Sequence, residues 1–250
     1  MPTFSHNDLD FAYLDEGEGE PVLLIHGFAS TKEINWVGPG WMSTLVRAGR
    51  RAIAFDNRGH GASTKLYERE AYDPAIMARD ALALMDHLGL PRADVMGYSM
   101  GGRIAACLAL EAPERVRSLI LGGIGIHLVE GAGLPVTVAE ALLAPSLEDV
   151  TDPTGRTFRM FAEVTKSDRR ALAACIYGSR RTLTREDVGR IGVPTLIAIG
   201  TKDAVSGAAR PLAALIPGAQ VVDIPDRDHM LAVGDKVFKE AALAFLNARP

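Results

Sequence analysis

Short, β-branched apolar runs alternate along this chain with longer segments of helical period. The central runs contain no alternating polar residues, which is typical of strands buried on both faces. The segments between them carry apolar residues at helical spacing. This alternation predicts an α/β protein with a mostly parallel, twisted sheet and helices on both faces. The predicted strands are 11–14, 22–25, 52–55, 95–98, 116–121, 195–199 and 220–224, and the predicted helices are 39–48, 74–88, 100–111, 208–215 and 236–247.

The alternation is interrupted once, from about residue 127 to residue 190. This stretch has no strand candidate and consists of short helical pieces separated by glycines and prolines. A length of 250 residues fits one domain with a small insertion. We therefore predict a core domain formed by residues 1–126 and 191–250, with residues 127–190 inserted as a small helical cap.

Composition excludes several classes of protein. With 48% hydrophobic and 23% charged residues the chain is too apolar to be disordered, and its apolar runs are too interrupted to span a membrane. A net charge of −4 with scattered lysines and arginines gives no surface for nucleic acid. Cys107 and Cys175 form no metal or disulfide motif, and the acidic N-terminal segment is unlike a signal peptide. These features predict a cytoplasmic protein, and they give no indication of an oligomeric state.

The sharpest motif is Gly97-Tyr98-Ser99-Met100-Gly101, which joins a predicted strand to a predicted helix. A turn this tight requires small residues two positions before and after the serine, because a β-carbon there would collide with neighbouring backbone. The turn holds Ser99 above the carboxyl end of the sheet, where open α/β folds bind ligands. We predict Ser99 as a nucleophile; the five residues alone also fit an ordinary glycine-rich junction.

A serine nucleophile needs a base and an acid that orients the base. Of the six histidines, His229 lies after the last predicted strand and before the last helix, on a loop that reaches the same sheet edge as Ser99. Asp203 follows the strand 195–199. The order serine, aspartate, histidine is that of elbow-type hydrolases. We predict His229 as the base and Asp203 as the acid. His229 with Asp226 and Asp228 lacks the spacing of metal ligands, so no metal is expected.

An oxyanion formed by attack on a carbonyl requires preset donors. Backbone N–H groups serve this purpose, and we predict those of Met100, after the nucleophile, and Phe28, in the loop after the strand 22–25. Apolar residues near this loop and in the insertion could wall a substrate pocket, although most of those in the insertion are expected in the core. The predicted pocket residues are Trp36, Trp41, Phe158 and Phe161.

Five short sequence blocks, given below in chain order, resemble those of the α/β-hydrolase superfamily. The resemblance runs from Phe11 to Phe245. It implies that fold, a serine, aspartate and histidine triad, and no cofactor. A serine as nucleophile departs from the haloalkane dehalogenases and epoxide hydrolases of the superfamily, which carry aspartate there. We therefore expect acyl transfer from a small-molecule ester of small to medium acyl chain. The blocks are His26-Gly27-Phe28, residues 56–63, residues 97–101, residues 200–203 and Asp228-His229-Met230.

Two other functions stay open. The sequence Gly97 to Arg103 is similar to the elbow of the menaquinone-pathway synthase, a carbon-carbon lyase that needs cationic residues to hold carboxylates. Arg103 matches that elbow. The second is a small-ligand receptor with slow turnover. A nucleotide site is not indicated, because no phosphate-binding loop is present. The other arginines that could hold a carboxylate are Arg156, Arg159, Arg169, Arg170, Arg180 and Arg181.

Overall fold

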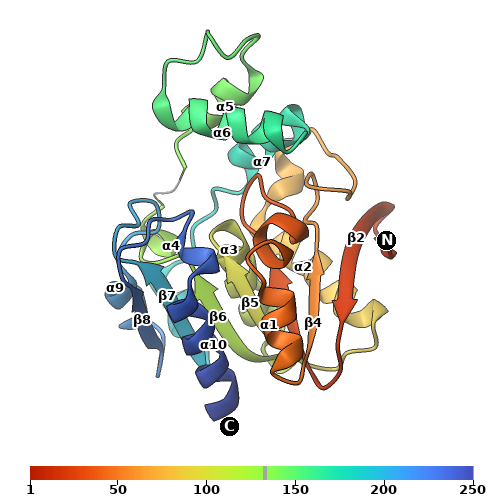
Figure 1. Cartoon of the computed structure of the whole chain (residues 1–250), viewed down its shortest axis with the longest axis vertical. Coiled ribbons are helices and arrows are strands. Elements are labelled where there is room, and N and C mark those ends of the chain that lie inside the picture. Colours follow the sequence, from red (N-terminus) through yellow and green to blue (C-terminus); the bar gives the residue numbers. More distant parts are fainter. Residues whose placement is uncertain (132–133, 250) are drawn as a thin grey trace.

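The computed structural model describes residues 1–131 and 134–249 and contains a twisted sheet with helices on both faces (Figure 1). The order across the sheet is β1-β2-β4-β3-β5-β6-β7-β8. The pairs β1/β2 and β2/β4 are antiparallel and all other neighbours are parallel. The predicted fold class is confirmed. The strands are β1 (Thr3–His6), β2 (Leu9–Glu16), β3 (Glu20–Ile25), β4 (Arg50–Phe55), β5 (Ala93–Tyr98), β6 (Val116–Gly122), β7 (Thr195–Gly200) and β8 (Gln220–Ile224).

Strand β1 was not among the predicted strands. It pairs with β2 at the sheet edge, where Phe4 faces Phe11 and the two rings stack. Within β1 only Phe4 is buried. A single buried apolar residue gives no apolar periodicity to detect in the sequence, so this strand is recognised only from its pairing with β2.

Two groups of helices cover the two faces of the sheet, and each face has its own apolar core. One face is covered by α1 (Trp41–Arg47) and α10 (Lys236–Ala248), the other by α2 (Pro74–His87), α3 (Met100–Glu111) and α9 (Ala209–Ala213). Shorter helical turns lie at η1 (Glu33–Val37), η2 (Arg69–Tyr72), η3 (Pro113–Arg115) and η4 (Ala232–Gly234). Because they run parallel, strands β3, β5, β7 and β8 bring their carboxyl ends to one edge of this sheet.

Helices α4 (His127–Glu130), α5 (Thr137–Leu143), α6 (Pro153–Val164), α7 (Arg169–Gly178) and α8 (Arg185–Gly189) lie between β6 and β7. Figure 1 shows α5, α6 and α7 as a layer above the sheet. Asp152 and Asp168 cap the starts of α6 and α7 by accepting backbone N–H groups. Apolar side chains such as Leu142 and Leu172 join this layer to the core below. The division into domains at residues 126 and 191 stays a prediction.

In residues 1–131 and 134–249 no helix is both long and apolar enough to cross a membrane.

Candidate active site

Ser99 occupies a strained turn between β5 and α3. Its φ and ψ are 55° and −116°, a conformation that residues with a β-carbon rarely adopt. The neighbouring glycines make the turn possible. A β-carbon on Gly97 would lie 2.1 Å from the carbonyl oxygen of Gly101, and one on Gly101 would lie 2.0 Å from that of Ile25. The packing of α3 against β5 and β3 therefore fixes the place of the serine hydroxyl.

The structure brings the three residues of the predicted triad together from the ends of three strands. Ser99 Oγ is 2.9 Å from His229 Nε2, and His229 Nδ1 is 2.8 Å from Asp203 Oδ2. The Asp203 side chain is fully buried and that of His229 is 13% exposed. The imidazole can thus take a proton from the serine on one side while the carboxylate stabilises the resulting cation on the other.

Asp203 is held by more donors than the sequence indicated. Its Oδ1 accepts the backbone N–H groups of Val205 and Ser206 at 2.8 and 3.0 Å. Its Oδ2 accepts the Ser206 hydroxyl at 2.6 Å. Burial alone would raise the pKa of Asp203, but the hydrogen bonds from His229 and Ser206 outweigh it and leave that pKa below its usual value. Ser206 was not predicted; an aspartate followed three residues later by serine is the turn signal that could have indicated it.

A further hydrogen bond holds the backbone of the base, and two of the other histidines bind backbone groups. Tyr98, next to the nucleophile, donates its hydroxyl to the His229 carbonyl at 2.6 Å. His26 and His60 order backbone instead of facing Ser99: His26 Nε2 accepts the N–H of Asn57, and His60 Nδ1 donates to a carbonyl. Burial lowers the pKa of both imidazoles, to about 3 for His60, so they are neutral at pH 7.

Of the two predicted oxyanion donors, Met100 follows Ser99 in the chain, and Phe28 follows Gly27, where an added β-carbon would lie 3.3 Å from that of Ser99. Within the described part of the chain, neither the Phe28 N–H nor the Met100 N–H donates a hydrogen bond to another group. Met100 begins α3, so its N–H is one of the groups that a helix start leaves free. The Phe28 loop is held by Asn35, whose Oδ1 accepts the N–H of Gly27 at 3.0 Å. Both groups are available to a developing negative charge.

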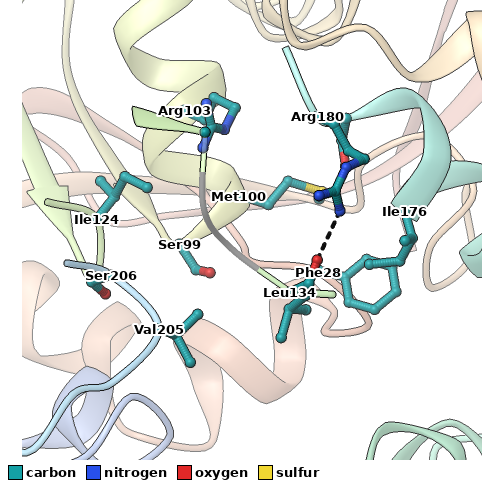
Figure 2. A pocket seen from close by; sticks show the side chains of 13 residues that line it. Phe28, Ser99, Met100, Arg103, Ile124, Leu134, Ile176, Arg180, Val205 and Ser206 are labelled. Carbon is teal, nitrogen blue, oxygen red and sulfur yellow. Dashed lines mark hydrogen bonds between the residues drawn. The ribbon is translucent and has the colours of Figure 1, made fainter. Parts of the chain in front are cut away.

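Two cavities adjoin Ser99. The apolar cavity lies between the Phe28 loop and α6, and its lining includes Phe158 and Phe161, two of the predicted pocket residues. Ile34, Met230 and Val233 line it too, although they were not predicted. The arginine cavity lies on the other side of Phe28 and Leu134 and reaches the end of α7. Figure 2 shows its lining, which includes Met100, Arg103, Ile124, Ile176, Arg180 and Ser206.

The prediction that Trp36 or Trp41 walls the pocket is wrong. Both side chains are fully buried in the core between the sheet and helices α1 and α10, and they line neither cavity. Trp41 packs edge-on against Phe238 of α10, and its Nε1 donates to the carbonyl of Val233. Trp36, in η1, packs edge-on against Trp41 at the start of α1, so both rings bury their apolar surface in the core.

Arg103 has a structural role. Its guanidinium donates to the backbone carbonyls of His127, Leu128 and Arg181, and the side chain is buried. It thereby connects α3 with the start of the helical insertion and with the segment between α7 and α8. A carboxylate of a ligand would have to compete with these bonds.

Comparisons with known proteins agree with the fold. Residues 20–141 match the family model described as "alpha/beta hydrolase fold". The chain is 33% identical over 246 residues to the dihydrolipoyllysine-residue acetyltransferase component of the acetoin cleaving system of Pseudomonas putida, covering 91% of this chain and 64% of that protein. It is 39% identical over 121 residues to a 2-hydroxymuconate semialdehyde hydrolase of Pseudomonas putida, covering 48% of this chain and 42% of the relative.

Among solved structures, a hydrolase from Pseudomonas aeruginosa PA01 superposes with a TM-score of 0.80 at 27% identity, covering 99% of this chain and 98% of that one. The strand order of the sheet, the turn at Ser99 and these similarities all point to the same family. The chain belongs to the α/β-hydrolase superfamily.

Proposed function

We propose that this protein hydrolyses carboxylic esters of small to medium acyl chain through an acyl-enzyme intermediate. The observation that carries the proposal is the hydrogen-bonded series from Ser99 through His229 to buried Asp203, beside a cavity lined mostly by apolar side chains. An apolar cavity suits an acyl chain, and a serine activated by imidazole suits attack on its carbonyl carbon.

The steps follow from the geometry. Ser99 Oγ attacks the carbonyl carbon while His229 Nε2 takes the hydroxyl proton, and the N–H groups of Phe28 and Met100 stabilise the oxyanion. Collapse breaks the bond to the alcohol, which leaves with the proton from His229. Water then attacks the acyl-serine, gives a proton to His229, and releases the acid as the proton returns to Ser99 Oγ.

Labelling tests the nucleophile. A fluorophosphonate should modify the protein once, at Ser99, and the Ser99→Ala variant should not be labelled while keeping its circular dichroism spectrum. Removing the serine of such a triad lowers kcat by about 10⁶-fold. Labelling that persists in a folded Ser99→Ala protein would contradict the assignment.

A chain-length series of p-nitrophenyl esters tests the substrate class. Each buried methylene contributes about 0.8 kcal/mol until the cavity wall is reached, so kcat/KM should rise and then fall with chain length. We expect the best ester between about C2 and C8, because the residues 127–190 that cover the site form a short cap. Efficient hydrolysis of monomeric C16 esters, without a fall from C8, would show that the cap does not limit chain length.

Carbon-carbon bond hydrolysis is the second candidate, because the chain is 39% identical over 121 residues to the 2-hydroxymuconate semialdehyde hydrolase. The similarity to a carboxylate-binding lyase is weakened by Arg103, which donates to three carbonyls. A dicarboxylated lyase substrate run beside the ester series separates the two chemistries. Ligand-induced thermal stabilisation with almost no turnover of any substrate would instead favour a receptor.

A further inference from the structure

We propose that the arginine cavity is a subsite for a carboxylate of the substrate, which Arg180 binds, so that the preferred ester carries a carboxylate on its acyl or its alcohol part. This inference rests on the proposed ester hydrolysis and adds a charge requirement to it. It assigns the apolar half of the substrate to the apolar cavity and the anionic half to the arginine cavity.

The charge of the lining residues is unbalanced. The described lining of the arginine cavity contains the guanidinium groups of Arg103 and Arg180 and no aspartate or glutamate. Burial lowers the pKa of Arg103, and the positive charge of Arg180 lowers it further, so the two cations act on one another across this space. An anion placed between them would relieve this repulsion.

The two arginines differ in how many of their N–H donors are already used. Arg103 is buried and donates to three carbonyls. Arg180 is exposed at the end of α7 and, among the described residues, donates one hydrogen bond, to the carbonyl of Leu134 at 2.8 Å, with no carboxylate within 4 Å (Figure 2). A guanidinium has five N–H donors in a planar fork that matches a carboxylate. Arg180 can therefore bind a carboxylate without losing its present partner.

The place of Arg180 relative to Ser99 also fits a substrate group. Both residues line the arginine cavity, and the side chains of Met100, Ile176 and Leu134 line it as well. These apolar side chains suit a short run of methylene or aromatic carbons between the reacting carbonyl and the carboxylate. An ester that reaches from one end of the cavity to the other would place its carbonyl at the serine and its anion at the guanidinium.

Three esters that release a benzyl alcohol test the subsite. Benzyl butyrate is neutral, monobenzyl glutarate carries a carboxylate on the acyl part, and 4-(butyryloxymethyl)benzoate carries it on the alcohol part. In Arg180→Gln, kcat/KM for at least one charged ester should fall about 10- to 100-fold, chiefly through KM, since a charge-assisted hydrogen bond is lost. The value for benzyl butyrate should change less than twofold.

Arg181→Gln is the matched control. Arg181 is the next residue, is 54% exposed, and pairs with Asp73 at 3.3 Å outside the cavity lining. Its replacement removes the same charge from the same helix end and should leave all three kcat/KM values within twofold. Equal losses on the three esters in Arg180→Gln, or equal losses in both variants, would overturn the subsite.

Calorimetric titration of Ser99→Ala with monobenzyl glutarate separates failure of the subsite from failure of ester hydrolysis. Binding that weakens at least tenfold in the double variant with Arg180→Gln supports the subsite even if the wild-type protein hydrolyses no ester. Hydrolysis of benzyl butyrate together with unchanged binding in the double variant would refute the subsite and leave the proposed hydrolysis standing.

Discussion

At the scale of single residues, the geometry of the candidate triad depends on a fourth side chain. Ser206 donates its hydroxyl to Asp203 Oδ2 at 2.6 Å, and its Oγ lies 3.2 Å from His229 Nδ1. Its own N–H binds the other carboxylate oxygen. Ser206 therefore positions the acid from two sides without reaching Ser99, and it helps to hold the pKa of Asp203 below its usual value.

We expect Ser206→Ala to lower kcat/KM on p-nitrophenyl esters about tenfold, because one hydrogen bond to a charged group is removed. Loss of that bond raises the pKa of Asp203, so the carboxylate is protonated at a higher pH and the acid side of the pH profile moves upward. Ser179→Ala, a serine in the same cavity lining without a bond to Asp203, should leave the profile in place. An unshifted profile in Ser206→Ala would show that the hydroxyl is dispensable.

At the scale of elements, the site depends on how closely α3 approaches the sheet. Gly101, in the first turn of α3, lies against the end of β3, and Gly102 packs against Ile124 beyond β6. This approach places the start of α3, and with it the Met100 N–H, beside the loop that carries Phe28. The glycines are required by the contact between two elements and not by the helix itself.

We expect Gly101→Ala to reduce the free energy of unfolding by about 3 kcal/mol or more. Its β-carbon would lie 2.0 Å from a backbone oxygen of Ile25, so strand and helix would have to separate. Urea denaturation followed by circular dichroism measures the loss. Gly192→Ala is the control, since the nearest atom to its β-carbon would be 3.9 Å away. A Gly101→Ala protein within 1 kcal/mol of wild type would contradict this packing.

At the scale of the whole molecule, stability depends on polar groups buried beneath the Phe28 loop. Asp56 pairs with Lys32 at 2.6 Å, and both side chains are almost fully buried. The rings of His26 and His60 lie edge to face nearby, with centroids 5.2 Å apart. The four residues lie in the loops that follow β3 and β4, and the loop after β3 also carries Phe28.

We expect the free energy of unfolding to decrease as pH falls from about 6.5 toward 3. Burial lowers the pKa of His60 to about 3, so the folded protein leaves it neutral while the unfolded chain binds a proton below about 6.5. In this window the unfolded state holds more protons, and acid favours it. Urea titrations at several pH values should give a smaller pH slope for His60→Asn than for wild type. Equal slopes would mean that His60 does not contribute.

Local sequence patterns were sufficient to predict the alternation of strands and helices, the turn at Ser99 and the chain order of Ser99, Asp203 and His229. These features are local, because apolar periodicity, glycine spacing and position relative to a strand end depend only on residues close together in the sequence. Because parallel strands bring their carboxyl ends to one edge, the order of the elements was enough to predict that the three residues meet.

Which side chains face the cavities could not be predicted from local patterns. Trp36 and Trp41 turned into the core, whereas Arg180 came to line a cavity with Ser99 from 81 positions away in the chain. Strand β1 and the bond from Ser206 to Asp203 were likewise not predicted. The direction of a side chain depends on how segments far apart in the sequence pack against one another. Burial of apolar surface fixes that packing, and the apolar periodicity of a segment reports this burial only as an average over one element.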